Sequence, residues 1–397
     1  MLTISQNDDF LVANYGTFPI SFLKRFLQTR FFSGKLNFPK WSTIETRNES
    51  VISVSTKYYP LRMHLDNIVS KQSGSTQCFT TFYLQSADVV EMAEGNNLVQ
   101  LEPGKIIDKY TVTRKLGEGS FGAVYAVKYA EGKQAALKAE SVNEKVPLLR
   151  LELIVMQRLQ ARNAVHMPDL IDKGRFEHFN YIVMKLLGKS LQEAKKSGPD
   201  QHLSLGPAIG CSIQCLEALE ELHWAGFLHR DVKPGNFAVG RAETGDLRKL
   251  YILDFGMCRK YVDNKNVMLQ PRKKAPFRGT PRYAPITSHN YKEHCRKDDI
   301  ESWFYMLIDF TNAQLPWKGV MNIKDVGKTK VDSRQEPLLS EMMKLCPREE
   351  YKQVLDHIDG LQFFDEPDYQ MIYVTLRKAM SRNSVKEFPY DWEKFTQ

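Results

Sequence analysis

The segment best equipped for chemistry is Leu228–Asn236, which reads L-H-R-D-V-K-P-G-N. Asp231 can accept a proton from a hydroxyl group, and Asn236 can offer a neutral oxygen to a hard cation such as Mg²⁺. Lys233 can neutralise the charge of a phosphate group during its transfer. The segment therefore combines a proton acceptor, a candidate metal ligand and a cation that could neutralise phosphate charge. Its structural alternative is a turn with a buried histidine and a surface Asp–Lys pair.

A second acidic residue stands where a metal ligand would complement Asn236. Asp254 follows the short apolar run Leu250–Leu253 and begins the tripeptide Asp-Phe-Gly, 18 residues after Asn236. The run predicts a strand that ends at this carboxylate, and Gly256 permits the turn that follows. We therefore expect Asn236 and Asp254 to hold Mg²⁺ together.

The elements around the first segment predict that it is a loop. An apolar run with helical periodicity, Cys211–Leu222, precedes it, and a strand-like run, Phe237–Val239, follows it. Pro234 and Gly235 prevent a helix from continuing through the segment. A loop between rigid elements is where catalytic side chains are commonly displayed.

Three glycines, Gly117, Gly119 and Gly122, form the pattern G-x-G-x-x-G within Tyr110–Tyr125. Without a Cβ atom, glycine lets backbone N–H groups approach an anion closely. Dinucleotide-binding folds share this pattern, but here the glycines connect two strand-like runs and no helix pattern begins after Gly122. The spacing therefore favours a flap over the phosphates of a nucleotide.

Lys138 is the single lysine within the strand-like run Gln134–Glu140, 16 residues after Gly122. A surface lysine is the ordinary interpretation, whereas a buried ammonium group would need an anionic partner. Glu152, 14 residues later in a helical run, is the candidate partner. Glu140 is the runner-up, and we expect it to meet solvent.

Together these motifs resemble those of protein kinases: H-R-D-x-x-x-x-N, D-F-G, the glycine flap and a lysine on the third strand. The resemblance covers about residues 107–385. It implies that Asp231 orients the acceptor hydroxyl and takes its proton, while Lys233 and Mg²⁺ stabilise the migrating phosphoryl group. It also implies that Thr280 hydrogen-bonds Asp231 and Lys233, which favours serine and threonine acceptors. The implied ATP pocket consists of Leu116, Gly117, Gly119, Gly122, Val124, Ala136, Lys138, Glu152, the gatekeeper Met184 and Leu187.

The chain departs from the general kinase pattern at Ala284-Pro285-Ile286, where A-P-E is expected, so the acid that would pair with a late arginine is missing. This departure is similar to the casein kinase 1 group, and further motifs are similar to its tau-tubulin-kinase-like branch. Those motifs are Phe277–Pro285, Gly235, Arg296–Asp299 and Gln314–Trp317. The resemblance implies that Asp299 supports the backbone of the catalytic loop.

Residues 254–285 hold eight basic residues and two acidic ones. Because arginine clusters bind phosphate through paired hydrogen bonds, we expect a dock for acidic or already phosphorylated protein substrates. A solvated charged face is the alternative. The expected anion site joins Arg230 with Arg282, and Lys328, close to Lys330, is added from the spacing of casein kinase 1 relatives.

The expected fold class is α+β, a bilobal kinase fold. Residues 105–395 should form the kinase domain, with a small antiparallel β-sheet lobe over about 105–185 and a larger, mainly helical lobe over about 186–395. Residues 1–104 form an N-terminal extension without an assigned function. Within it, Ile20–Phe31 has helical periodicity, and Val51–Tyr59 and Phe79–Leu84 have the composition of strands.

Composition narrows the alternatives. No apolar segment reaches the roughly 20 residues of a membrane span, and the six cysteines contain no C-x-x-C pair that would indicate zinc. We expect a cytoplasmic protein, with the nucleus as a second location. The net charge of +8 lies in residues 105–397 and favours acidic protein partners or nucleic acid, with a solubilising surface charge as the alternative. No nucleic acid is expected, because the basic runs lack interleaved aromatic residues.

The rival hypothesis is a pseudokinase that serves as a binding scaffold. Such a chain would lack at least one of Lys138, Asp231, Asn236 and Asp254, and all four are present. We therefore expect an active serine/threonine protein kinase that uses ATP and Mg²⁺. The sequence predicts no oligomeric state.

Overall fold

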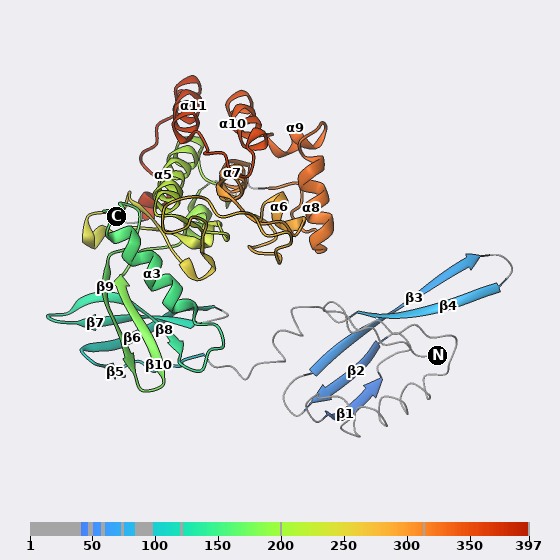
Figure 1. Ribbon diagram of the computed structural model, residues 1–397, viewed down its shortest axis with the longest axis horizontal. Helices are drawn as coiled ribbons and strands as arrows, with labels where there is room; N and C mark the ends of the chain where they lie inside the picture. Colours follow the sequence, from blue (N-terminus) through green and yellow to red (C-terminus); the bar gives the residue numbers. More distant parts are fainter. Residues whose placement is uncertain are drawn as a thin grey trace. The chain divides into compact units, whose positions relative to one another are not determined.

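The computed structural model describes residues 41–46, 51–56, 60–72, 75–83, 98–119, 122–198, 201–312 and 314–395. The chain forms two compact units, residues 1–97 and 98–397. Figure 1 shows the ribbon of both units, coloured along the sequence.

The described part of the first unit is an antiparallel sheet with the strand order β1-β2-β3-β4. Its strands are β1 (Trp41–Thr46), β2 (Val51–Thr56), β3 (Pro60–Gln72) and β4 (Ser75–Tyr83). The strands expected at Val51–Tyr59 and Phe79–Leu84 are present as β2 and β4, whose β-branched and aromatic residues favour extended backbone. The helix expected over Ile20–Phe31 lies outside the described residues.

The second unit begins with a six-stranded antiparallel sheet in the order β5-β6-β7-β8-β10-β9. Tyr110, Tyr125 and Phe179 are fully buried in its apolar core. The hydroxyl of Tyr125 also donates to the main-chain oxygen of Val99 at 2.7 Å, so the segment from Val99 onward is packed into this unit. The strands are β5 (Ile106–Ile107), β6 (Tyr110–Gly119), β7 (Gly122–Tyr129), β8 (Lys133–Ser141), β9 (Leu170–Phe176) and β10 (Phe179–Lys185).

Helix α3 (Leu148–Gln160) packs against this sheet through β9 and β10. Its buried residues recur at helical spacing and form one apolar face, whose burial against the sheet stabilises the packing. Glu152 is the single charged residue on that face. The helix therefore carries one carboxylate into the interior, next to the sheet.

The rest of the second unit is mainly helical. Helices α5 and α7 form its centre, where the fully buried Trp303 donates its indole N–H to the main-chain oxygen of Ser212 at 2.7 Å. Asp299, which is expected to support the catalytic loop, lies in the first turn of α7. The helices are α4 (Leu191–Ala194), α5 (Leu205–Trp224), α6 (Ile286–His289), α7 (Arg296–Asn312), α8 (Ile323–Asp332), α9 (Leu338–Met342), α10 (Arg348–Gly360) and α11 (Tyr369–Arg382).

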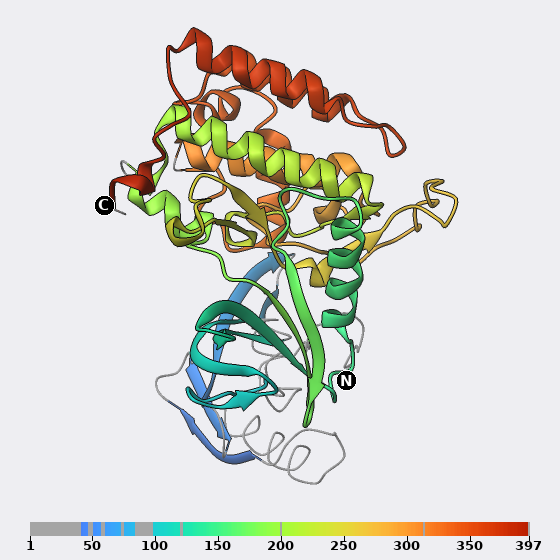
Figure 2. The same cartoon turned by 90° about the vertical axis from the view of Figure 1, so that its left-hand side faces the viewer.

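Two short strand pairs lie in this helical part and frame the loops of interest. They are β11 (Phe227–Leu228) with β14 (Arg259–Lys260), and β12 (Phe237–Val239) with β13 (Leu250–Ile252). Figure 2 shows the sheet and α3 at one end of this unit and the helices at the other. The expected α+β fold class with two lobes is confirmed. No helix among the described residues is both long enough and apolar enough to span a membrane.

Candidate active site

The loop that carries Asp231 is fixed to helix α7 by a buried carboxylate. Asp299 accepts the main-chain N–H groups of His229 at 2.7 Å and Arg230 at 2.8 Å. The Nε2 atom of His223 on α5 lies 2.9 Å from the same carboxylate. Burial alone would raise the pKa of Asp299, but these hydrogen bonds, above all that from His223, hold it below its usual value. The loop is therefore tied to two helices of the core.

Asp231, which is 8% exposed, is oriented by Thr280, Lys233 and Asn236. Its Oδ1 atom accepts both the main-chain N–H and the hydroxyl of Thr280, each at 2.9 Å. Its Oδ2 atom lies 2.7 Å from Nζ of Lys233, which is also 3.2 Å from the Thr280 hydroxyl. The side-chain nitrogen of Asn236 lies 3.3 Å from Oδ2 and donates to the main-chain oxygen of Asp231 at 2.9 Å. The carboxylate is thereby held in one orientation beside a cation.

Asn236 and Asp254 come together because β12 and β13 pair. Phe237 lies opposite Ile252, and the N–H of Leu253 donates to the main-chain oxygen of Asn236 at 2.8 Å. The amide nitrogen of Asn236 is engaged within its own loop, so its side-chain oxygen is the atom left for a cation. Asp254 adds a carboxylate that is 48% exposed. Two such oxygen donors suit Mg²⁺, which usually keeps several waters and is completed by substrate phosphates.

Lys138 on β8 joins helix α3 to Asp254. Its Nζ atom lies 2.5 Å from Glu152 and 3.2 Å from Asp254. Burial opposes the charge of the ammonium group, but the two carboxylates outweigh burial and raise the pKa of Lys138. Burial likewise opposes the charge of Asp254, but attraction from Lys138 lowers its pKa. The group expected to reach the ATP phosphates is therefore charged and held from two sides.

Glu140, the runner-up partner of Lys138, has another role. The prediction that it meets solvent is wrong, because its residue is 2% exposed. Its carboxylate accepts the main-chain N–H of Leu149 at 2.9 Å, near the start of α3. The first N–H groups of a helix have no partner within the helix and favour a negative charge nearby. Glu140 thus supports the helix that carries Glu152.

The residues expected around the nucleotide base lie on neighbouring strands. Ala136 lies opposite Met184 across β8 and β10, and both are 7% exposed. Val124 lies opposite Lys138 across β7 and β8. The structure therefore places these four residues side by side on the adjacent strands β7, β8 and β10, with the charged Lys138 next to the apolar ones. Leu187 follows β10 in the chain and is partly buried.

The expected flap is the turn between β6 and β7, where Gly119 pairs with Gly122 and Gly117 with Val124. A Cβ atom on Gly122 would lie 2.7 Å from the main-chain oxygen of Ala139 on β8. Only glycine lets the returning strand pass that oxygen without a shift. Leu116, just before the flap, is 38% exposed.

Arg230 lies among other arginines. Its Nε atom donates to the main-chain oxygen of Met257 at 2.8 Å. Burial, together with the like charges of Arg278 and Arg259, lowers the pKa of Arg230 to about 10. The structure thus brings Arg230 to Arg259 and Arg278, which sequence reasoning did not predict.

Glu293 supplies the negative charge for this cluster. Its carboxylate lies 3.1 Å from Nε of Arg259 and is also ion-paired with Arg272. Burial opposes ionisation, but these arginines, Arg272 first, lower the pKa of Glu293. Sequence reasoning missed this residue. The available signal was that Glu293 is the only acidic residue in 264–297, a strongly basic stretch.

The expected anion site of Arg230, Arg282 and Lys328 is not held together by the contacts in the described residues. Arg282 is ion-paired at 2.5 Å with Asp309 of α7, which is fully buried. Lys328 is exposed on α8. The lysine of α8 that turns inward is Lys330, which is fully buried. The helical period decides this, because residues two apart on a helix face different directions.

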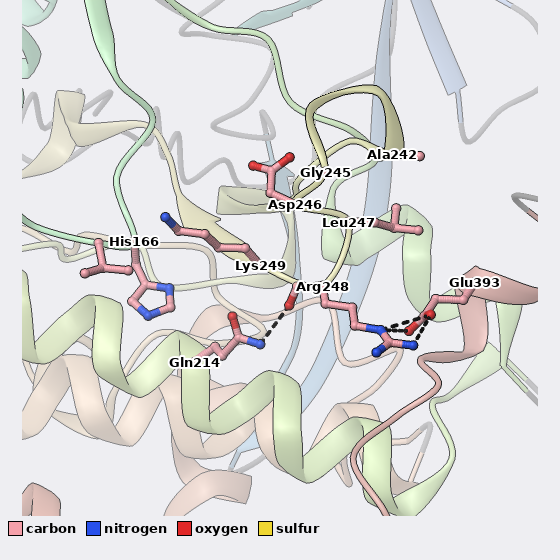
Figure 3. Close-up of a pocket in the computed structure, with 10 residues that line it drawn as sticks. His166, Gln214, Ala242, Gly245, Asp246, Leu247, Arg248, Lys249 and Glu393 are labelled. Atoms are coloured by element: carbon pink, nitrogen blue, oxygen red, sulfur yellow. Dashed lines mark hydrogen bonds and ion pairs between the residues drawn. The ribbon is translucent and has the colours of Figure 1, made fainter.

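A separate pocket of about 680 Å³ lies near helix α5 and the connection between β12 and β13 (Figure 3). Its lining includes His166, Gln214, Asp246 and Lys249, and an ion pair between Arg248 and Glu393 at 2.9 Å crosses one side. None of the residues predicted for catalysis lines it. It is therefore distinct from the site around Asp231.

Comparison with known proteins gives a consistent result. The family description "Protein kinase domain" matches residues 110–377. A probable serine/threonine-protein kinase of Dictyostelium discoideum is 35% identical over 287 residues, which cover 72% of this chain and 56% of that protein. The serine/threonine-protein kinase spe-6 of Caenorhabditis elegans is 34% identical over 292 residues, which cover 72% of this chain and 76% of that protein. The chain thus spans little more than half of the length of the first relative.

Proposed function

Because the chain belongs to the protein kinase family, we propose that it transfers the γ-phosphoryl group of ATP to serine or threonine hydroxyls of acidic or already phosphorylated proteins. Residues 110–377 form a serine/threonine protein kinase domain. The observation that carries the proposal is the contact of Thr280 and Lys233 with the two oxygens of Asp231. This arrangement presents an oriented base beside a cation.

Each side chain has a definite part in the proposed transfer. Asp231 orients the acceptor hydroxyl and accepts its proton as the oxygen attacks phosphorus. Lys233 stabilises the charge on the phosphoryl group, and Thr280 keeps Asp231 and Lys233 in register. Lys138, held by Glu152, binds the phosphates of ATP. When bound at Asn236 and Asp254, Mg²⁺ neutralises phosphate charge, so that catalysis rests on positioning and electrostatics.

The substrate preference rests on the charge of the activation segment, defined as residues 254–285. Lys273, Lys274 and Arg278 in this segment are exposed. They follow Arg272, whose charge is already paired with Glu293. Exposed basic groups beside a site that handles phosphates favour an acidic or phosphorylated acceptor sequence.

The subgroup and the location are part of the same proposal. We assign the chain to the casein kinase 1 group, near its tau-tubulin-kinase-like branch, because of Gly235, Gln314–Trp317 and the absent acid after Pro285. We also propose a cytoplasmic location with access to the nucleus.

The activity is tested with the purified full chain, labelled ATP and Mg²⁺. We expect transfer to serine and threonine of an acidic protein such as casein, and no detectable transfer by the Asp231→Asn variant. Equal incorporation by the two proteins would contradict the proposed mechanism. A melting temperature that rises with ATP and Mg²⁺, without any turnover, would instead favour the pseudokinase scaffold.

The substrate preference is tested separately with paired peptides that differ only in acidic or phosphorylated flanking residues. The double variant Lys273→Gln/Lys274→Gln should raise the KM for the acidic peptide several-fold and leave that for the neutral peptide unchanged. Lys378→Gln, an exposed lysine of α11, is the matched control for lost surface charge. A wild-type enzyme that prefers the neutral peptide would refute the acidic preference.

A further inference from the structure

The acceptor loop, defined as residues 280–286, lacks the acid that the A-P-E pattern places after Pro285. In the A-P-E pattern the acid would pair with an arginine later in the chain. Here Ile286 occupies that position. Thr280, at the other end of the acceptor loop, holds Asp231. Whatever fixes this loop therefore also fixes the base.

A carboxylate from helix α7 contacts the backbone of Ile286, the residue that stands in place of the absent acid. Glu301 is 2% exposed, and its Oε1 atom accepts the main-chain N–H of Ile286 at 3.1 Å. The same oxygen accepts the hydroxyl of Tyr305 at 2.5 Å and lies 3.1 Å from Nη2 of Arg334. The ion pair that the A-P-E pattern would supply from the acceptor loop is thus formed from α7, with the loop joined to it through its backbone.

Arg334 connects this carboxylate to the rest of the helical lobe. Its guanidinium group donates to the Tyr305 hydroxyl at 2.9 Å and to the main-chain oxygen of Lys330 at 3.1 Å. On its other side it pairs with Asp359 of α10 at 3.2 Å. Burial would raise the pKa of Glu301, but Arg334 and Lys297 lower it. The carboxylate of Glu301 on α7 is therefore ionised, and Arg334 links it to Asp359 on α10.

Two more side chains hold the remaining backbone of the acceptor loop. Nζ of Lys330 donates to the main-chain oxygens of Pro281 at 2.7 Å and Ala284 at 2.5 Å. The indole N–H of Trp317 donates to the main-chain oxygen of Arg282 at 2.7 Å. With Glu301, these groups contact the loop backbone at four points within six residues.

We propose that Glu301, paired with Arg334, replaces the absent acid as the anchor of the acceptor loop and is a positioning residue for the protein substrate. This inference rests on the proposed kinase function. Glu301 does not touch ATP or the reacting atoms. It acts through Ile286 and the loop to keep Thr280 on Asp231 and to keep the surface that receives the acceptor peptide in place.

The first test replaces Glu301→Gln, which keeps the shape and removes the charge. We expect the KM for the acceptor peptide to rise about tenfold, with the KM for ATP within about twofold of wild type. Asp359→Asn is the matched control, because it removes the other carboxylate on Arg334 and leaves the Ile286 contact intact. Equal effects of the two variants, or an unchanged acceptor KM in a folded Glu301→Gln protein, would overturn the proposal.

A second pair of variants tests the contact without altering the buried carboxylate. Ile286 is the first residue of α6, and Pro285 has φ −70° and ψ 160°, which a following proline tolerates. Ile286→Pro therefore deletes the N–H donor with little strain, whereas Ile286→Ala keeps it. We expect a raised acceptor KM and faster hydrogen exchange of the amides at 282–284 for Ile286→Pro relative to Ile286→Ala. Identical behaviour of the two would overturn the proposal.

Hydrogen exchange also separates this inference from the function on which it rests. A wild-type protein without turnover on any acceptor would refute the proposed function. The exchange of the acceptor loop in Glu301→Gln, relative to Asp359→Asn, would still show whether the anchor exists. Faster exchange confined to the loop supports it, and exchange equal in the two variants refutes it.

Discussion

Thr280 donates its main-chain N–H and its hydroxyl to the same carboxylate oxygen of Asp231, each at 2.9 Å. A single residue of the acceptor loop thereby sets the rotation of the catalytic carboxylate. The other oxygen is occupied by Lys233 at 2.7 Å. The base is therefore prepared by contacts within the protein before a substrate arrives, which is the property that electrostatic catalysis requires.

Thr280→Ala should reduce kcat by about tenfold to a hundredfold, because it removes one of the two hydrogen bonds to Oδ1 and the hydroxyl that Lys233 contacts. Thr280→Ser keeps the hydroxyl and should retain most of the activity. Steady-state kinetics at saturating ATP and peptide provide the measurement. A Thr280→Ala enzyme with the kcat of wild type would show that the main-chain N–H alone orients Asp231.

Lys138→Met should reduce kcat by about a hundredfold or more, since the variant loses the cation expected at the ATP phosphates. Glu152→Gln should be less severe, because Asp254 still lies 3.2 Å from the ammonium group. Nucleotide affinity, measured by titration calorimetry, should fall in the same order. If Glu152→Gln were the more damaging change, helix α3 would have a larger role than the ammonium group itself.

His289 predicts a loss of stability in acid. Its Nδ1–H donates to the main-chain oxygen of Ile323 at 2.9 Å, so that Nε2, 3.3 Å from Nζ of Lys330, can only accept. Burial and then the charge of Lys330 lower the pKa of His289 to about 4, whereas nearby Glu301 raises it. Between pH about 6.5 and 4 the unfolded chain binds a proton that the folded one does not, so stability falls as pH falls.

For this partly exposed ring the loss should be about 1–2 kcal/mol after allowance for solvent screening. Urea unfolding at pH 7 and pH 4.5 measures it. His289→Gln cannot titrate and should show a smaller loss between the two pH values. A pH dependence as large as that of wild type would assign the effect to other groups.

From the ion pairs of Glu293 we predict that activity does not depend on phosphorylation of the activation segment. Thr280 is the only serine or threonine in 254–285, and its hydroxyl is already bound to Asp231. The carboxylate of Glu293 already pairs with Arg259 and Arg272, whose charges a phosphate group would otherwise neutralise. Phosphatase treatment should therefore leave kcat and KM unchanged.

Glu293→Gln provides the complementary measurement. Without the carboxylate, the like charges of Arg230, Arg259 and Arg272 are no longer compensated. The variant should lose about 1–3 kcal/mol of unfolding free energy, and sulfate should stabilise it more than it stabilises wild type. A wild-type enzyme inactivated by phosphatase would contradict this interpretation of Glu293.

Much of the catalytic site was predictable from the sequence because its chemistry is local. Asp231, Lys233 and Asn236 share one loop, and β12 and β13 lie close in the chain, so short spacing alone brings Asp254 to Asn236. Even the contact between Lys138 and Glu152 follows from one strand and the next helix. Residue type and short separation leave few arrangements for such groups.

The tertiary structure alone decided which distant groups meet. Arg282 binds Asp309, and Lys330 rather than Lys328 reaches the acceptor loop. Glu293 pairs with Arg259, and Glu301 accepts the main-chain N–H of Ile286. Each of these pairings joins elements whose relative rotation depends on the packing of the whole helical lobe. The sequence by itself therefore determined the catalytic groups and the lobes that carry them. How the activation segment is held became visible only once α7, α8 and the loops between them were packed together.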